Sequence, residues 1–352
     1  MNDKVIYFDN AATTPLLPEV ADLMYFSLMN NYGNPSSVHQ IGRHAKVELE
    51  KARRIVAGLL NVQPGEIFFT SGGTEANNSI LTGCARDLGR RHFITSKLEH
   101  PSVLNILGAV QKQYACKVSY VNFDEKGILD LDHLEQLIHN NPDSVVSLMH
   151  ANNETGNLLP IKEAGNLCQK YRTLFHSDTV QTAGKFALDF QKLPVDFAVF
   201  SAHKFHGPKG VGAMFVKAGT GIKPYIFGGA QERNMRAGTE NVAGIAGMAK
   251  ALDLVTCNMD TAFKKITELR SFLIEELPKE IPGLKFLGDA TGNSLYTIIN
   301  FALPGRMESG QIMSLLDLSG ICASAGSACS SGSNKPSPVL LAMGVDPLTP
   351  NL

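Results

Sequence analysis

A lysine with the setting of a covalent catalyst follows one short apolar run of this sequence. Residues 197–200 are Phe-Ala-Val-Phe, and Ser201-Ala202-His203-Lys204 comes directly after them. A lysine at the carboxyl end of a buried strand is costly as a free cation unless it is paired or used covalently. Desolvation also lowers the pKa of such an amine and makes it a nucleophile. From these four residues alone, a surface lysine at a strand end is the simpler interpretation of Lys204.

A carboxylate and an amide follow the preceding apolar run in a similar way. Asp178 comes after residues 174–176, and Gln181 lies one turn further along the chain. Pyridoxal phosphate requires a carboxylate against its ring nitrogen, because the protonated ring is the electron sink. Asp178 can supply that carboxylate, and Gln181 can donate to the ring hydroxyl oxygen. Taken singly, an aspartate at this position is more often a helix cap.

A glycine-rich turn predicts a phosphate cradle. Ser71-Gly72-Gly73-Thr74-Glu75 separates the apolar run 66–70 from an expected helix. Glycines there let the backbone approach an anion, and the helix N-terminus presents free N–H groups. The turn has neither the Gly-Lys-Ser/Thr of a Walker A loop nor a GxGxxG fingerprint. An ordinary helix cap is the alternative interpretation.

Two further side chains have suitable chemistry. His100 follows the run 92–95, and it is either a hydrogen-bonded edge residue or a ring that lies on a planar cofactor and moves protons. Cys329 lies between serines and glycines in residues 326–332, the polar setting of a reactive thiol, although a harmless loop cysteine fits as well. We interpret four other cysteines as packing residues: Cys84, Cys116, Cys168 and Cys257.

The elements that position these residues alternate along the chain between about residues 45 and 255. Alternation of strands and helices predicts an α/β fold with a mainly parallel sheet covered on both faces, and ligands bind beyond the carboxyl ends of such strands. We expect a large domain at 15–256 and a small domain formed by 1–14 and 257–352. The expected strands are 66–70, 92–95, 117–121, 145–149, 174–176, 197–200, 213–216 and 296–301, and the expected helices include 131–138, 161–171 and one from 263 that Pro278 ends.

Composition limits the possible classes of function. The 352 residues are 44% hydrophobic and 18% charged, with a formal net charge of -1. A chain with that much apolar material is not disordered, and its balanced charge gives no basic footprint for nucleic acid or an anionic membrane. The N-terminus shows no basic segment followed by an apolar run, and no CxxC pair occurs. We therefore expect a cytoplasmic protein without a resident metal.

Taken in order, the motifs resemble those of the NifS/IscS-like cysteine desulfurases within the class V aminotransferase family. The resemblance spans nearly the whole chain. It is carried by residues 7–14 (Tyr-Phe-Asp-Asn-Ala-Ala-Thr-Thr), 33–37, 69–78, 150–156, 178–181, 201–204, 207–210, 228–233, 236–241 and 326–332.

The resemblance implies a fold-type-I pyridoxal phosphate enzyme that works as a homodimer on L-cysteine. Lys204 would hold the cofactor and move a proton, and Cys329 would take the substrate sulfur as a persulfide while alanine leaves. An iron–sulfur scaffold or another sulfur acceptor would be the partner, and Cys329 could contact a transferred cluster. The implied cofactor contacts are Asp178 to the ring nitrogen, Gln181 to the ring oxygen, His100 stacked on the ring, Gly73, Thr74, Ser201 and His203 at the phosphate, Thr239 from the partner subunit, and Asn153 beside the substrate.

The sequence departs from the family pattern in one respect. Family members continue into a segment resembling Ser-Ile-Arg-x-Ser, whose arginine binds the substrate carboxylate, whereas the last arginine here is Arg306. A charged hydrogen bond is worth about 1.5–3 kcal/mol, so its loss would weaken substrate capture roughly ten- to a hundredfold. A weakly active or regulatory form is therefore one alternative. A selenocysteine lyase and a class V aminotransferase are two others, although transamination requires no thiol.

Overall fold

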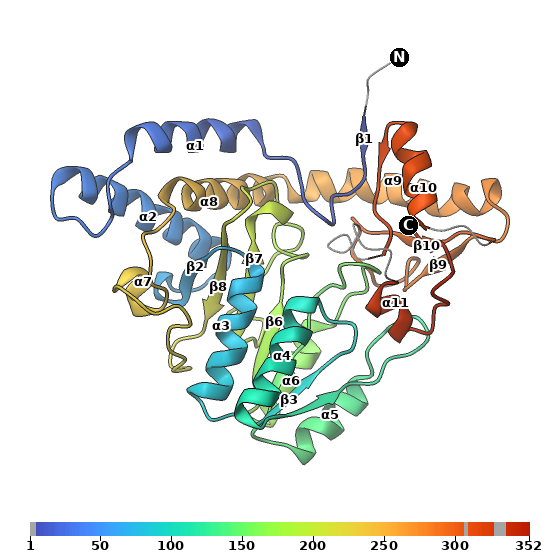
Figure 1. Cartoon of the computed structure of the whole chain (residues 1–352), viewed down its shortest axis with the longest axis horizontal. Coiled ribbons are helices and arrows are strands. Elements are labelled where there is room, and N and C mark those ends of the chain that lie inside the picture. Colours follow the sequence, from blue (N-terminus) through green and yellow to red (C-terminus); the bar gives the residue numbers. More distant parts are fainter. Residues whose placement is uncertain (1–4, 306–308, 327–335) are drawn as a thin grey trace.

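The computed structural model describes residues 5–305, 309–326 and 336–352 (Figure 1). Its centre is a seven-stranded sheet in the order β2-β8-β7-β6-β5-β3-β4. The neighbours from β7 through β6, β5 and β3 to β4 pair in parallel, whereas β8 is antiparallel to both β2 and β7. The predicted α/β class with a mainly parallel sheet is confirmed. The strands are β2 (Ile67–Thr70), β3 (His92–Thr95), β4 (Lys117–Tyr120), β5 (Val145–Ser147), β6 (Leu174–Asp178), β7 (Phe197–Ser201) and β8 (Gly212–Val216).

Helices cover both faces of this sheet, and strand β7 shows how the faces are built. Phe197 and Val199 belong to one buried cluster, whereas Ala198 and Phe200 belong to the other. Successive side chains of a strand point to opposite faces, so an uninterrupted apolar strand is the pattern of a sheet covered twice. The surrounding helices are α1 (Pro18–Asn30), α2 (Gln40–Leu59), α3 (Gly73–Arg86), α4 (Pro101–Tyr114), α5 (Leu131–Asn140), α6 (Ile161–Lys170), α7 (Gln231–Asn234) and α8 (Val242–Cys257).

The rest of the chain forms a C-terminal region (residues 259–352, as far as the structure describes them) beside one end of the sheet (Figure 1). The long helix α9 (Met259–Glu280) follows α8 at an angle of 68°. The N-terminal strand β1 (Ile6–Tyr7) pairs in parallel with β11 (Ile321–Cys322), so the N-terminal segment joins the C-terminal region. The other elements are β9 (Lys285–Leu287), antiparallel to β10 (Asn300–Ala302), and the helices α10 (Ser309–Leu318) and α11 (Pro338–Ala342).

Three local predictions were wrong. The expected strand 296–301 is short: Tyr296 and Ile298 pack against Ala151 in a small apolar cluster, and the strand begins only at Asn300. Pro278 does not end the helix at that residue, because it lies in the last turn of α9, which continues to Glu280. Cys257 is exposed at the end of α8, whereas Cys84, Cys116 and Cys168 are buried as predicted.

Within the part of the chain that the structure describes, no single helix is both long and apolar enough to cross a bilayer. Helices α8 and α9 reach that length and apolarity only when the bent pair is taken together.

Candidate active site

Lys204 lies at the carboxyl edge of the sheet, in the 3₁₀ turn (Ala202–Lys204) that follows β7. Its side chain is buried, and Nζ donates hydrogen bonds to the carbonyl oxygens of Ala11 and Ala12, the second at 2.8 Å. The N-terminal segment is held in place by the same turn, since the Thr14 hydroxyl donates to the His203 carbonyl oxygen at 2.9 Å. The lysine therefore projects into a space that residues far apart in the sequence enclose.

A relay of hydrogen bonds connects Asp178, at the end of β6, to His100. The Asn77 amide, on α3, donates to Asp178 Oδ2 and to Ser102 Oγ, both at 2.9 Å. Ser102 Oγ lies 2.8 Å from His100 Nδ1. Asp178 Oδ1 accepts from the Val180 backbone N–H at 3.0 Å. Asn77 is fully buried, and its two donors match these two acceptors, so the aspartate is held with its carboxylate already oriented.

His100 is the N-cap residue of α4, and this fixes the state of its ring. Nδ1 accepts a hydrogen bond from the Ser102 backbone N–H at 3.1 Å. A neutral imidazole whose Nδ1 is an acceptor has its proton on Nε2. Burial lowers the pKa of His100, Asp178 opposes that effect, and Lys204 lowers the pKa further. The ring is therefore poised as a neutral donor through Nε2.

The glycine-rich turn forms one wall of a pocket of about 390 Å³. Gly73 begins α3, and a Cβ at this position would meet Val180 Cγ2 at 2.8 Å, so only glycine fits without movement. The helix N-terminus, the Ser201 side chain at the end of β7 and the imidazole of His203 converge on the pocket. This combination of free N–H groups and hydroxyls suits a phosphate group. The pocket is lined by Ala12, Thr13, Ser71, Gly72, Gly73, Thr74, Glu75, Ser201, His203, Lys209 and Gly210.

His203 and a second buried lysine, Lys185, both lie close to other positively charged side chains. Burial, then Lys204, Lys209 and Lys185 lower the pKa of His203 to about 4. Burial and the neighbouring Lys204 lower the pKa of Lys185 to about 7. Lys185 Nζ donates to the carbonyl oxygens of Gln181 at 2.8 Å and Lys204 at 3.4 Å. This lysine, which the sequence analysis missed, connects the backbone of Gln181, just after Asp178 in the chain, to the backbone of Lys204.

Glu99 is a second buried group that sequence reasoning missed. Its carboxylate is 1% exposed, and Oε1 accepts from the Met149 backbone N–H at 2.8 Å. Burial raises the pKa of Glu99 well above its usual range, the hydrogen bond from Met149 opposes that rise, and Asp178 adds to it. A second link runs from the Asn152 amide to the Leu98 carbonyl oxygen at 2.8 Å. The loop that carries His100 is thereby fastened to the loop that carries Asn153.

Several buried polar atoms around this space have no partner among the described residues. They are the side-chain oxygens of Asn77, Asn153 and Gln181. The Gln181 amide nitrogen donates to the Ala11 carbonyl oxygen at 3.0 Å. Buried polar groups are almost always paired in folded proteins, so such oxygens around one space indicate a polar ligand. Together with a lysine, a carboxylate and a phosphate cradle, they suit a planar, phosphate-bearing group.

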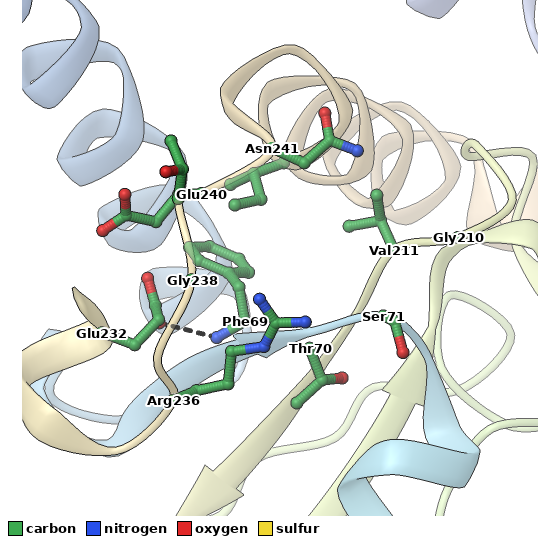
Figure 2. Close-up of a pocket in the computed structure, with 12 residues that line it drawn as sticks. Phe69, Thr70, Ser71, Gly210, Val211, Glu232, Arg236, Gly238, Glu240 and Asn241 are labelled. Atoms are coloured by element: carbon green, nitrogen blue, oxygen red, sulfur yellow. Dashed lines mark hydrogen bonds between the residues drawn. The ribbon is translucent and has the colours of Figure 1, made fainter. Parts of the chain in front are cut away.

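Thr239 does not line this pocket but a neighbouring one of about 210 Å³, shown in Figure 2. The two pockets share Ser71 and Gly210. The wall around Thr239 is held by the ion pair between Arg236 and Glu75, with Nε and Oε1 3.0 Å apart. Thr239 itself is exposed, which is compatible with a contact to another subunit.

The turn that precedes Thr239 is strained and is held by a buried ion pair. Glu232, Arg233 and Asn234 have positive φ angles of 45°, 56° and 64°, a conformation that costs non-glycine residues roughly 1–2 kcal/mol each. Glu232 accepts from Arg53 through both oxygens, at 2.7 and 2.8 Å, and from the Phe69 backbone N–H, the contact dashed in Figure 2. Arg53 is 1% exposed, so this pair lies fully inside the protein.

Cys329 lies outside the described residues. Within residues 5–305, 309–326 and 336–352, no group of three or more His, Cys, Asp or Glu side chains could hold a metal ion.

Comparison with known proteins places the chain in a family. The aminotransferase class V family matches residues 6–345. A cysteine desulfurase IscS of Dictyoglomus turgidum is 44% identical over 97% of this chain and 86% of its own length. A solved NifS-like protein has a TM-score of 0.90 at 38% identity, covering 98% of this chain and 91% of that one. A solved SspA in complex with cysteine has a TM-score of 0.83 at 30% identity, covering 97% and 95%.

This chain therefore belongs to the class V aminotransferases, the pyridoxal-phosphate-dependent family that its fold and its lysine-centred site define. Within that family it belongs with the cysteine desulfurases. The unpartnered oxygens, the glycine cradle and the buried Lys204 fit pyridoxal phosphate.

Proposed function

We propose that this protein is a cysteine desulfurase that converts L-cysteine to L-alanine and passes the sulfur to Cys329. The observation that carries the proposal is the convergence of Lys204, Asp178 and the glycine cradle at one edge of the sheet. This convergence occurs in a chain 44% identical to a cysteine desulfurase.

Different residues of the site would contact different parts of the cofactor. Lys204 would attach it, and Asp178, oriented by Asn77, would pair with its ring nitrogen. Gly73, Thr74, Ser201 and His203 would surround its phosphate, since all four line the same pocket. Asn153 would use its unpartnered oxygen beside the substrate, and Gln181, whose amide nitrogen donates to the Ala11 carbonyl oxygen in this structure, would lie beside the ring oxygen. When bound, pyridoxal phosphate supplies an electron sink for the bonds at the substrate α-carbon.

Lys204 and His100 are the proton-moving groups of this proposal. Lys204 is buried at the carboxyl edge of the sheet, and its Nζ is the amine that would take the substrate proton. His100 presents Nε2–H because Ser102 occupies Nδ1. A neutral imidazole at this place would stack on the ring and donate a hydrogen bond through Nε2–H without adding a charge beside Lys204.

The sulfur transfer balances without an external oxidant. The Cys329 thiolate forms a bond to the substrate sulfur, and the carbon–sulfur bond breaks with its electron pair on carbon. The two sulfur atoms are each oxidised by one electron, and the substrate carbon is reduced by two. The proton lost by the Cys329 thiol ends on carbon, where it completes the methyl group of alanine.

We also propose that the enzyme is a homodimer in which Thr239 reaches the partner subunit's phosphate site. The segment that includes α1 and the start of α2 exposes large apolar side chains, of which Tyr32 is 74% and Val38 88% exposed. Exposed apolar residues on this scale mark protein interfaces. The others on this segment are Tyr25, Phe26, Leu28, Met29 and Val47.

The remaining partners and the organisation follow from the same activity. A persulfide is useful only if an acceptor collects it, so the partner would be an iron–sulfur scaffold or another sulfur acceptor. A reduced thiol at Cys329 favours a cytoplasmic location. We assign residues 15–256 to a cofactor-binding domain, and residues 1–14 with 257–352 to a domain that carries Cys329, in keeping with the pairing of β1 and β11.

The experiment that tests the function supplies L-cysteine without reductant to the purified, cofactor-loaded enzyme. Alanine release and the mass of the Cys329 peptide are measured together. The expected result is alanine together with a Cys329 peptide one sulfur atom heavier. The Cys329→Ala variant should keep the lysine-linked cofactor absorbance but accept no sulfur. Bound cofactor with neither alanine nor a modified peptide would contradict the proposal.

A further inference from the structure

The loop beside the cofactor site contains a buried carboxyl group that contacts the C-terminal region. Glu154 follows Asn153 and is 5% exposed. The Asn152 side chain fixes the backbone at Glu154, because Asn152 Oδ1 accepts from the backbone N–H groups of Glu154 and Thr155, both at 2.9 Å. The turn that carries Asn153 therefore also holds Glu154 in place.

The Glu154 carboxylate reaches the C-terminal region at a specific place. Its Oε2 accepts a hydrogen bond from the hydroxyl of Ser337, which is 6% exposed. The same hydroxyl oxygen caps α11, since it accepts from the Leu340 backbone N–H at 3.2 Å. A second link runs from the Asn300 amide to the Glu154 carbonyl oxygen at 3.2 Å.

Both ends of the sequence stretch that contains Cys329 meet at this contact. Gly326 precedes the stretch, has φ +57°, and a Cβ on it would lie 3.1 Å from Ser337 Cβ. Ser337 follows the stretch on its other side. Glu154 therefore connects the loop of the cofactor site to the point where the flanks of the Cys329 stretch come together.

We propose that Glu154 and Ser337 form an anchor that fixes the base of the Cys329 stretch against the cofactor site, and that both are positioning residues for sulfur transfer. The proposal rests on the proposed desulfurase function. Neither side chain is placed on the cofactor or on the substrate. Their contribution is therefore to the transfer step and not to cofactor capture.

The two roles of Ser337, cap and anchor, can be separated by substitution. Ser337→Asp keeps the helix cap, because aspartate caps helices as well as serine does. It also removes the donor and sets a carboxylate against the Glu154 carboxylate. The double variant Glu154→Gln with Ser337→Asp restores a donor and an acceptor, since the glutamine amide can donate to the aspartate.

The test follows a single turnover of L-cysteine on the cofactor-loaded enzyme, measured as the rate at which the Cys329 peptide gains sulfur. Loss of the hydrogen bond to this buried carboxyl group predicts that Ser337→Asp is slowed at least about tenfold. The cofactor absorbance should be unchanged, and the double variant should return close to the rate of Glu154→Gln alone. Ser314→Ala, which removes a hydroxyl bonded within α10, is the matched control and should react like wild type.

Two results would overturn the anchor. One is a wild-type rate in Ser337→Asp, and the other is a double variant as slow as Ser337→Asp. Hydrogen exchange at residues 337–342 gives a readout that does not depend on activity: the single variant should exchange faster and the double variant should recover. If the wild type forms neither alanine nor persulfide, the proposed function has failed, and exchange then decides whether the contact exists at all.

Discussion

Helices α8 and α9 follow one another in the chain and form one bent rod, yet they belong to differently built regions (Figure 1). In α8, ten residues are buried, including Ile245, Met248 and Leu252, whereas α9 contributes no buried residue. The first packs against α1 and α2, whereas Phe263 of α9 packs edge-on against Tyr296 of the C-terminal region. The sheet region is therefore stabilised by a continuous core, whereas the C-terminal region depends on a few specific contacts.

The two regions would carry out different steps of the proposed reaction. Cofactor binding requires groups held rigidly, and Lys204, Asp178 and Asn77 are buried in the sheet region. The thiol that takes the sulfur belongs to the other region. Its connection to the site runs through β1 with β11 and through the Glu154–Ser337 anchor. Changes in the sheet region should therefore affect chemistry or global stability, and changes in the C-terminal region should affect transfer or very little.

The largest effect should come from Lys204→Ala. Removing the amine removes covalent capture of the cofactor and a general acid–base group that is worth roughly 10²–10⁴ in rate. The variant should lose the visible absorbance of the lysine-linked cofactor and its production of alanine. Absorbance spectra and alanine assays check this. A Lys204→Ala protein that keeps that absorbance would refute the lysine assignment. Lys192→Ala, which removes a surface lysine whose side chain is 81% exposed, is the matched lysine control for the spectrum.

The next effect concerns stability. Arg53→Ala leaves the buried Glu232 carboxylate unpaired and should lower the free energy of unfolding by about 3–5 kcal/mol. Denaturant titration measures that change. Arg54→Ala, next in sequence and exposed, is the control and should be nearly neutral. Equal stability of the two variants would show that the ion pair does not hold the strained turn before Thr239.

A pH-dependent effect should follow from Glu99. Burial raises the pKa of this carboxyl group in the folded state, so the folded protein keeps a proton that the unfolded chain releases. Wild-type stability due to Glu99 is therefore complete below the unfolded pKa of about 4.3 and is lost as the pH rises toward the folded pKa. The glutamine of Glu99→Gln does not titrate. The melting temperature of this variant should therefore rise relative to that of the wild type as the pH is raised from acid to neutral.

The control for that measurement is Glu125→Gln, which changes an exposed glutamate. Its melting temperature should stay parallel to wild type across the pH range. A Glu99→Gln curve equally parallel to wild type would mean that Glu99 is ionised in the folded protein.

The smallest effect is expected on the surface of the C-terminal region. Lys279→Ala removes an ion pair with Glu276 near the end of α9, where the lysine is largely exposed. Exposed pairs gain little, because water screens them and both side chains lose freedom. The melting temperature should be unchanged within error. A clear drop would show that α9 depends on its surface charges and would weaken the contrast with α8.

The sequence reveals those parts of the site that lie directly after apolar runs. Asp178, Ser201 and Lys204 were found in this way, because strand ends in a parallel sheet share one edge. Asn77 and Lys185 were missed, because their importance depends on contacts between separate elements. A motif shows only that Asn77 follows the glycine turn, whereas its partners Asp178 and Ser102 come from β6 and α4.

The C-terminal region was harder to predict for a related reason. An apolar stretch such as 296–301 indicates a strand, but here most of it packs as a small cluster against the loop of the cofactor site. The Glu154–Ser337 contact joins positions far apart in the chain, and neither residue type signals it. Regions built from few long-range contacts leave little periodicity in the sequence.

The most direct test of the central claim uses L-cysteine labelled with a heavy sulfur isotope and the cofactor-loaded wild-type enzyme. The claim is that chemistry prepared in the sheet region is delivered to a thiol of the C-terminal region. The peptide that contains Cys329 should gain one heavy sulfur atom, in an amount equal to the alanine released in the first turnover. Alanine released while that peptide stays unmodified and another cysteine carries the label would contradict the account.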